Sequence, residues 1–376
     1  MGLQIKQIKL RNFRNYETFS LSDLGQLNLF IGSNAIGKTN LLEALQLTSA
    51  GFSFKNAKAN HLRKSGSAIT DIESVIAGDG RELSIRLVID EQGKQYFVNG
   101  KKKPLRDVKG ILPSVVFSPD DLTLIKGGQK EKRNSLDQLG SQLSRNYDAT
   151  RRDYEKILRQ KNGYLKEEVS PQVLDSLNEV MASIGSQLYA LRLSLLSELI
   201  PYVKEAYGKI VNQKEAVDIS YIPSWDDKEP NFYEKFSVPE PYRRAQARKT
   251  LEEIFTSNKE DEIARGRSSA GPHLDKIEFY IDSKNAGVFA SQGQQRSLVL
   301  AYKIAEMELI KERLNQYPVL FLDDVMSELD KSRRDELTHL VAGNSQTFIT
   351  STNLGYFEDD IYAHAKVYKL GDLLGS

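Results

Sequence analysis

The sequence predicts an α/β fold that is interrupted by a stretch of long helices, and three observations support this prediction. First, an apolar run at 27–31 precedes a loop at 32–39 that matches G-x-x-x-x-G-K-[ST], and a helical pattern follows the loop. Second, the continuous apolar run at 318–322 is typical of a parallel strand that is buried on both faces. Third, from about residue 140 the chain carries long charged segments whose apolar residues recur at helical spacing.

The composition limits the class of protein. The chain has 376 residues, enough for two or three domains, and its 52 basic and 51 acidic residues mean that nucleic acid would need a local basic patch. The lack of cysteine excludes disulfides, thiolate zinc sites and a cysteine nucleophile. No apolar stretch has the length that spans a bilayer, and residues 1–6 lack the apolar core of a signal peptide, so we expect a cytoplasmic protein without a membrane partner.

The first predicted strand lies at residues 3–10, where the apolar alternation shifts by one position, as in an edge strand with a bulge or in two short strands. The residues that follow, 11–16, leave two interpretations open. In one, Phe13 or Tyr16 stacks on an adenine while Arg14 reaches a phosphate. In the other, the stretch is a polar hairpin with one buried ring.

The loop at 32–39 is predicted to bind the phosphates of ATP or GTP. Gly32 and Gly37 allow a tight turn, so that backbone N–H groups and the N-terminus of the next helix point at the β- and γ-phosphates. Lys38 supplies a positive charge for binding and catalysis, and Thr39 supplies a magnesium ligand. The alternative is a plain glycine turn before a helix. The predicted binding residues of this loop are Gly32, Ser33, Asn34, Ala35, Ile36, Gly37, Lys38 and Thr39.

The region after the first helix is predicted to contain mainly loops and antiparallel strands. Residues 50–66 form a basic loop. Residues 83–89 alternate with a period of two, and turns at 90–93 and 99–100 flank a further strand at 95–98. The basic loop and the lysines at 101–103 are candidates for contacts with a phosphate backbone, although a solvated loop and a soluble sheet edge also explain them. Another short strand is expected at 115–117.

The helical region is predicted to form a short antiparallel arm. Its helices are expected at 147–165, from 171 onward and, after an irregular stretch rich in proline at 212–241, at 242–264. The basic residues at the start of the last helix either bind phosphates or form a solvated face. In the second helix, seven residues step by three or four and predict a packing seam: Val173, Leu177, Val180, Ile184, Leu188, Leu191 and Leu195.

Two motifs near the C-terminal end complete the predicted chemistry. A polar loop opens a long helix, and its Ser291 hydroxyl, Gly293 backbone and helix N-terminus form a second anion-binding surface, which suggests a nucleotide shared by two loops. Asp323 and Asp324 follow the second apolar strand, at the sheet edge where open α/β sheets bind ligands. Asp323 suits a magnesium ion held through water, and Asp324 is the candidate for orienting or deprotonating the attacking water. The alternative is a strand that ends in a polar turn.

Taken together, these motifs resemble the RecF family of bacterial recombination and repair ATPases, which is related to the ABC and structural-maintenance-of-chromosomes head domains. The resemblance covers nearly the whole chain, and the joint occurrence of its last two motifs is the most specific part. It rests on Phe13-Arg14-Asn15-Tyr16, on the loop at 32–39 with residues 40–44, on 117–122, on Gly271-Pro272-His273, on 291–296 and on 322–330.

The resemblance implies an ABC-type ATPase head, in which a mixed sheet with the P-loop joins an antiparallel β subdomain, and a short coiled-coil-like helical arm inserted into it. Residues 1–139 and 266–376 would form the head, and residues 140–265 would form the arm. It also implies a head-to-tail homodimer that depends on ATP and Mg²⁺, in which each nucleotide lies between the two copies. The residues that would close over the nucleotide of the other copy, or signal across the interface, are Ser291, Gly293, Gln295 and Asp330.

For function, the resemblance implies an ATP-dependent DNA-binding protein of recombinational repair and replication restart. Such a protein binds double-stranded DNA next to single-strand gaps, helps RecO and RecR to place the RecA recombinase, and hydrolyses ATP slowly as a weak DNA-dependent ATPase. The chain departs from the broader ABC pattern in three places: Asp324 stands in place of a glutamate, residues 118–121 offer no water-positioning glutamine, and Ser351 stands in place of a switch histidine. Within the family's own pattern, Leu274 replaces a usually basic residue and Lys132 an arginine.

Two other functions stay open at this stage. One is a nucleotide-binding subunit of a membrane transporter, against which stand the long arm and the lack of a transporter-type signature loop. The other is a scaffold in which ATP only sets dimerisation and which never acts on DNA.

Overall fold

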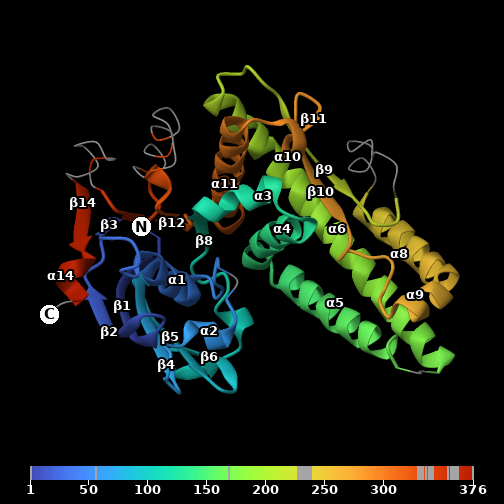
Figure 1. The fold of residues 1–376 in the computed structure, drawn as a ribbon, viewed down its shortest axis with the longest axis horizontal. Helices are drawn as coiled ribbons and strands as arrows, with labels where there is room; N and C mark the ends of the chain where they lie inside the picture. Colours follow the sequence, from blue (N-terminus) through green and yellow to red (C-terminus); the bar gives the residue numbers. More distant parts are fainter. Residues whose placement is uncertain are drawn as a thin grey trace. The chain divides into compact units, whose positions relative to one another are not determined.

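The structure is a computed structural model that describes residues 2–55, 57–167, 170–226, 239–327, 334, 337, 343–353, 355 and 364–374 (Figure 1). The chain divides into two compact units: unit 1 consists of residues 1–121 and 306–376, and unit 2 of residues 122–305. Unit 2 therefore contains the predicted arm together with the loop at 291–297. The three-part division at residues 139 and 265 stays a prediction.

Unit 1 contains a parallel sheet whose strands are, in spatial order, β14 (Ala365–Lys369), β3 (Leu27–Ile31), β13 (Thr347–Ser351), β12 (Val319–Asp323) and β8 (Ser114–Phe117). The apolar strand predicted at 318–322 is β12, which pairs in parallel with β13 on one side and β8 on the other. Every residue of β12 is buried. The prediction of a buried central parallel strand is confirmed.

A second sheet of unit 1 is antiparallel, with the order β2 (Tyr16–Ser22), β1 (Gln4–Phe13), β4 (Thr70–Gly78), β5 (Arg81–Asp90), β6 (Gly93–Val98) and β7 (Lys101–Lys103). The register of β1 against β4 shifts between Ile5 and Gln7, so the predicted bulge is present. However, β1 is not an edge strand, because β2 pairs with its other side.

Two of these strands, β2 and β4, are not predicted by the alternation of apolar residues. In β4 the reason is that two inward-facing side chains are polar and buried. Thr70 donates a hydrogen bond to the carbonyl oxygen of Asn12, and the Ser74 hydroxyl lies 2.6 Å from that of Thr48. These distant partners satisfy the hydroxyl groups, so the strand can bury them, and its sequence alone does not show this.

Helix α1 (Lys38–Ser49) packs in a core that both sheets share. The core cluster includes Leu41 and Leu45 of α1, Ile8 of the antiparallel sheet, and Phe321 and Phe348 of the parallel sheet. The start of α1, and with it the loop at 32–39, is therefore held by the main core of unit 1. The two other helices described here are α2 (Ala59–Leu62), inside the stretch predicted as a loop, and α14 (Leu370–Leu374).

Unit 2 is mainly helical. Helix α6 (Pro171–Ile210) is its longest described element, and α5 (Arg145–Tyr164) and α8 (Glu240–Ser257) pack along it (Figure 1). These are the three predicted arm helices, except that the last one divides at Asn258 into α8 and α9 (Lys259–Arg265). No described helix is long and apolar enough to cross a membrane. The remaining helices are α3 (Thr123–Lys126), α4 (Gln129–Leu143), α10 (Ala286–Phe289) and α11 (Gln292–Leu314), in which the unit border at 305/306 falls.

The predicted seam of α6 is wrong at two of its positions, whereas Leu177, Leu188 and Leu195 are buried as predicted. Val173 and Val180 are exposed, whereas Met181 between the expected seam positions is fully buried. Gly185 shows the reason, because a Cβ there would lie 3.2 Å from Tyr154 of α5 and 3.4 Å from Leu251 of α8. Since α6 packs against two helices at once, its buried stripe is wider than a heptad seam and is centred elsewhere.

The stretch predicted as irregular at 212–241 contains a strand, β9 (Val217–Ile222). It pairs antiparallel with β10 (Lys276–Ile281), which in turn pairs with β11 (Lys284–Asn285). The partner strand lies far along the chain, so the local proline pattern does not reveal the pairing. The later residues of the stretch, 227–238, lie outside the described residues.

Candidate functional site

The phosphate-binding loop predicted at 32–39 connects β3 to α1, as the motif requires. Lys38 is the first residue of α1, and its ammonium group donates hydrogen bonds to the carbonyl oxygens of Gly32 (2.7 Å) and Ser33 (3.0 Å). The lysine is thus turned inward over its own loop. The exposed residues of the loop are Ser33, Asn34 and Ala35.

Gly37, the residue before α1, is a position that accommodates only glycine. Its φ is 116°, and a Cβ there would lie 2.6 Å from Nδ2 of Asn15. That Asn15 amide donates to the carbonyl oxygen of Ile36 (2.9 Å), and the Tyr16 hydroxyl donates to the carbonyl oxygen of Gly37 (3.0 Å). Asn15 and Tyr16 therefore hold the backbone of the loop at 32–39, a role that the sequence pattern does not predict.

The structure corrects the nucleotide contacts considered for this stretch. Phe13 and Tyr16 are only 0% and 1% exposed, so neither ring is placed to stack on an adenine. Arg14 donates two hydrogen bonds of 2.9 Å to the carboxylate of Glu43 on α1, which is fully buried. Its charge compensates a buried carboxylate rather than facing a phosphate. The hairpin interpretation is correct, but with two buried rings instead of one.

Thr39 and Asp323, the two predicted magnesium residues, meet directly. The Thr39 hydroxyl donates to Oδ1 of Asp323 at 2.8 Å, across 284 positions of sequence. Burial raises the pKa of Asp323, and its hydrogen bonds from Thr39 and Thr350 oppose that shift. No group of three or more His, Cys, Asp or Glu side chains in the described part could hold a metal ion. A single carboxylate beside a hydroxyl fits Mg²⁺, which proteins commonly hold through one or two carboxylates together with nucleotide phosphates.

Asp324, the predicted catalytic carboxylate, follows β12 in an unusual backbone conformation. Its φ of 53° lies in the left-handed region, which non-glycine residues seldom adopt outside functional sites and turns. Its N–H donates to the carbonyl oxygen (3.2 Å) and the hydroxyl (3.0 Å) of Thr350. Burial lowers the pKa of Lys38, and the charges of Asp324 and Asp323 oppose that shift.

The second predicted loop lies in unit 2, at the N-terminus of α11. Ser291 is exposed, its hydroxyl accepts from the N–H of Gln294 (3.2 Å), and its N–H donates to Oε1 of Gln294 (2.8 Å). This reciprocal pair is a capping box, which starts the helix at this serine. The capping bond uses the Ser291 oxygen as an acceptor, so its hydroxyl proton can still be donated to an anion. Gly293 is half-buried within the first turn.

Two further residues, Gln295 and Asp330, were predicted for this site. Gln295 is 2% exposed, and its Nε2 donates to the carbonyl oxygen of Ala286 (3.0 Å), so this side chain does not reach the surface. Helical spacing explains the difference, because residues one turn apart share a face and Gln295 points inward with Leu298 and Val299. Asp330 lies outside the described residues.

The Gly271-Pro272-His273 motif belongs to a buried polar network of unit 2 that the sequence analysis missed. Arg192 of α6 pairs with Asp137 of α4 (2.7 Å) and donates to the carbonyl oxygen of Pro272 (2.6 Å). The available signal was Arg192 itself, a lone charge within the apolar run at 188–196. The side chains of this network, here called the Arg192 network, are Arg192, Asp137, Tyr147, Tyr221 and Asp275.

His273, next to the Arg192 network, predicts a pH dependence of stability. Its Nδ1 lies 2.7 Å from the Tyr154 hydroxyl, and burial lowers its pKa from 6.5 to about 4. Between these values the unfolded chain binds a proton that the native state does not, so His273 destabilises the fold as pH falls from about 6.5 to 4. His273→Asn removes this loss of stability, which amounts to about 1.4 kcal/mol for each pH unit between about 6.5 and 4.

Urea unfolding of the wild type and His273→Asn at pH 7.5, 6.0 and 5.0 measures this effect. The variant starts out less stable at pH 7.5, because it loses packing, and the gap narrows as the pH falls. The pKa of Asp275 is raised to about 6 by burial and gives the opposite slope, but it does so in both proteins and drops out of the difference. A gap that is constant with pH would contradict the prediction.

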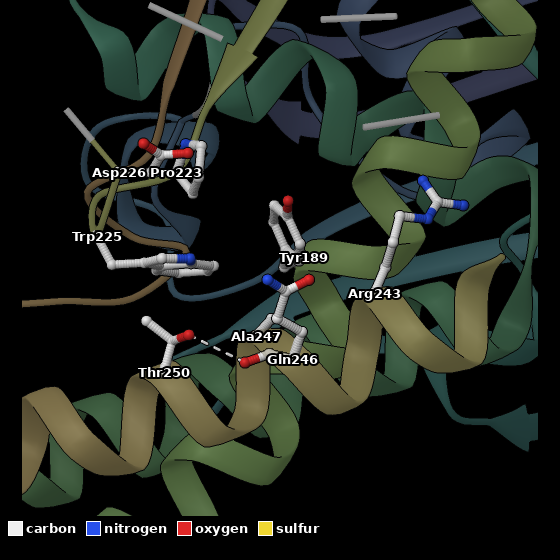
Figure 2. A pocket seen from close by; sticks show the side chains of 8 residues that line it. All are labelled: Tyr189, Pro223, Trp225, Asp226, Arg243, Gln246, Ala247 and Thr250. Atoms are coloured by element: carbon white, nitrogen blue, oxygen red, sulfur yellow. Dashed lines mark hydrogen bonds between the residues drawn. The ribbon is translucent and has the colours of Figure 1, made fainter. Parts of the chain in front are cut away.

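Unit 2 also holds a cavity of about 330 Å³ that is separate from the predicted nucleotide residues. Figure 2 shows the side chains that line it. Trp225 and Tyr189 meet edge to face with ring centroids 5.0 Å apart, and Nε and Nη1 of Arg243 are buried without a hydrogen-bond partner among the described residues. Of the basic residues at the start of α8, Arg243 lines this cavity, whereas Arg248 pairs with Glu252 on the same helix.

Comparison with known proteins gives a match along almost the whole chain. Residues 4–370 match the family described as RecF/RecN/SMC N terminal domain. The chain is 35% identical over 379 residues to the DNA replication and repair protein RecF of Lactobacillus acidophilus, covering 98% of this chain and 97% of that protein. It is 32% identical over 374 residues to the RecF protein of Staphylococcus carnosus, covering 98% of each.

The solved structures agree with the sequence comparison. The recombination mediator protein RecF-ATPrS of the RecFOR pathway superposes with a TM-score of 0.86 at 30% identity, covering 98% of this chain and 97% of that one. The Smc head domain of Pyrococcus furiosus, bound to the C-terminal domain of ScpA, has a TM-score of 0.53 at 14% identity and so shares the fold. By sequence and by its ATPase-head fold, the chain belongs to the RecF family of DNA replication and repair proteins.

Proposed function

We propose that this protein is an ATP-dependent DNA-binding protein of recombinational repair, which dimerises around ATP. The observation that carries the proposal is the hydrogen bond from Thr39, the residue after Lys38 on α1, to Asp323 at the C-terminal end of β12. Relatives supply the context, since solved structures of the RecF protein carry ATP and its ATPrS form within the RecFOR pathway.

The loop at 32–39 would hold the triphosphate. Its backbone N–H groups and the N-terminus of α1 bind the phosphates, and Lys38 exchanges two carbonyl acceptors for charged phosphate oxygens. Thr39 and Asp323 would hold Mg²⁺ beside them. When bound, the ion neutralises charge on the phosphates and orients them.

Hydrolysis would depend on few groups. Asp324 is the candidate for orienting or deprotonating the attacking water, and Lys38 stabilises the charge that develops on the phosphates. Asp324 has one methylene fewer than the glutamate at the corresponding ABC position, which fits slow turnover. Slow hydrolysis suits a protein whose ATP-bound state is the active one.

A second copy would close over the nucleotide with the loop that begins at Ser291. The exposed hydroxyl, the Gly293 backbone and the N-terminus of α11 together form a donor surface for the γ-phosphate. The γ-phosphate then has partners in both copies, so ATP favours the closed dimer, and its hydrolysis removes that preference.

DNA would bind to this dimer, with double strand next to a single-strand gap as the favoured substrate. The partners expected from the family are RecR and RecO, which act with it to place RecA, and the compartment expected is the cytoplasm. Because the formal net charge is only +1, DNA contact needs a local group of basic residues. The exposed lysines of β7 are one candidate group.

Molar mass in solution, with and without ATP and Mg²⁺, tests the proposal. We expect the 42.5 kDa chain to double in mass only when both are present. Ser291→Arg places a bulky cation where the second copy would close, so we expect it to bind ATP as tightly as the wild type and to remain a monomer. Ser176→Arg is a matched control, because Ser176 is an exposed serine of α6, and we expect it to dimerise normally.

Binding of the same samples to gapped duplex DNA extends the test. We expect retention of DNA to require ATP. We also expect the logarithm of the DNA affinity to fall linearly with the logarithm of the salt concentration, with a slope of about −0.9 for each phosphate contact. A mass that never changes with ATP would refute the dimer. An ATP-dependent dimer that shows no measurable binding to gapped DNA would favour the scaffold function.

A further inference from the structure

Thr350 lies between the two aspartates of the candidate site, although neither the motifs nor the family resemblance mark it. It is a fully buried residue of β13, and its Cα pairs with that of Asp323 on β12. Its hydroxyl donates to Oδ1 of Asp323 at 2.8 Å and accepts from the N–H of Asp324 at 3.0 Å. A single oxygen atom therefore contacts both residues of the Asp323-Asp324 pair.

The direction of these hydrogen bonds follows from the number of protons. A threonine hydroxyl has one proton, and the carboxylate oxygen at 2.8 Å is a closer and more negative acceptor than the Leu322 carbonyl oxygen at 3.4 Å. The same Oδ1 also accepts the Thr39 hydroxyl at 2.8 Å. Two hydroxyl groups, one from α1 and one from β13, thus fix the rotation of the Asp323 carboxylate.

The bond to Asp324 has a different effect. With φ at 53°, its backbone is in a conformation that costs energy for a residue with a Cβ. The N–H of Asp324 is anchored to both oxygens of Thr350, at 3.0 and 3.2 Å. These contacts help to hold the strained backbone conformation, and that conformation sets the direction in which the Asp324 side chain leaves the backbone.

We infer that Thr350 is a positioning residue for the metal and water chemistry of this site. Its hydroxyl orients the Asp323 carboxylate toward Mg²⁺ and keeps Asp324 in place next to it. The inference rests on the proposed function, because it assumes that Mg²⁺ and ATP bind here. Removal of an outer partner of a metal-ligating group commonly changes metal affinity by 10–100-fold, and we expect the low end of this range here because Asp323 would hold Mg²⁺ through water.

Nucleotide binding with and without Mg²⁺ tests the inference, with a fluorescent ATP analogue as the probe. Thr350→Val keeps the shape but removes the hydroxyl, and we expect the increase in affinity caused by Mg²⁺ to fall about 10-fold or more. Binding in EDTA, which depends on the loop at 32–39, should stay within about 3-fold of the wild type. Thr350→Ser restores the hydroxyl and should restore the response to Mg²⁺.

Controls separate positioning from packing. Thr347→Val is matched, because Thr347 is another buried threonine of β13 whose hydroxyl contacts only the carbonyl oxygen of Ser345 among the described residues, and it should bind like the wild type. If Thr350→Val does not fold, Thr350→Ala compared with Thr350→Ser gives the same contrast.

Three results would overturn the inference: a normal response to Mg²⁺ in Thr350→Val, an equal loss of binding in EDTA and in Mg²⁺, or failure of Thr350→Ser to restore the response. In each of these cases the proposed function still stands if Mg²⁺ raises the nucleotide affinity of the wild type. A wild type that binds no nucleotide would refute the proposed function and this inference together.

Discussion

Replacing Lys38 with methionine will weaken ATP binding by about 100-fold or more. The ammonium group lies at the start of α1, is largely removed from water and donates to the backbone carbonyl groups of Gly32 and Ser33. A triphosphate offers it charged acceptors, and each charge-assisted hydrogen bond of this kind is worth about 1.5–3 kcal/mol. Methionine has a similar length and no charge, so these bonds are lost. Titration of a fluorescent ATP analogue in Mg²⁺ measures the change.

The folded state should tolerate this substitution. Since burial lowers the pKa of Lys38, its charge is already unfavourable in the native protein, and the free energy of unfolding should change by roughly 1 kcal/mol or less. Lys311→Met is a suitable control, because it removes an exposed ammonium group that pairs with Glu308 on the same helix. Wild-type ATP affinity in Lys38→Met would show that the loop at 32–39 is not the phosphate site.

Replacing Arg192 with methionine will destabilise unit 2 by about 3–5 kcal/mol. The guanidinium group bonds the carboxylate of Asp137 and the carbonyl oxygen of Pro272, and its exposed fraction is 4%. Without it, the Asp137 carboxylate remains buried and loses its countercharge, which costs far more than the pair itself contributes. Chemical denaturation followed by circular dichroism measures the loss.

Two further variants identify the cause of that loss. In Arg192→Met with Asp137→Asn, the uncompensated charge is gone and Asn still accepts the hydrogen bond of Tyr147, so part of the stability should return. Arg151→Met removes a partly exposed arginine that pairs with Asp148 and Glu155, and it should cost less than about 1 kcal/mol. If Arg192→Met costs as little as Arg151→Met, the network does not support unit 2.

The sequence predicted features correctly where the interactions are between residues close in the chain, and it failed where they are between residues far apart. The loop at 32–39 and the buried strand before Asp323 were predicted because their function depends on consecutive backbone positions. The capping box at Ser291 is also local, since a helix start uses residues three apart. By contrast, the seam of α6 was misplaced, because its buried face is set by two helices whose positions the heptad pattern does not contain.

The same distinction separates the roles of individual residues. Tyr16 has a ring that suits an adenine and Arg14 a charge that suits a phosphate, yet Tyr16 donates to the carbonyl oxygen of Gly37 and Arg14 pairs with Glu43. Gln295 lies in a motif that is predicted to bind phosphate, but the helix turns its side chain into the core. Residue type alone therefore suggested chemistry in these cases, and the direction of the side chain decided it.

The sequence by itself determined the local elements of the candidate site: a G-x-x-x-x-G-K-[ST] loop before a helix, a buried strand that leads into two aspartates, and a serine at the start of a second helix. Only the tertiary structure decided which side chains surround them, such as Thr350 between the aspartates and Arg192 within unit 2. The physical reason is that backbone motifs satisfy their hydrogen bonds within a few residues, whereas a buried side chain needs a partner that the fold brings from elsewhere in the chain.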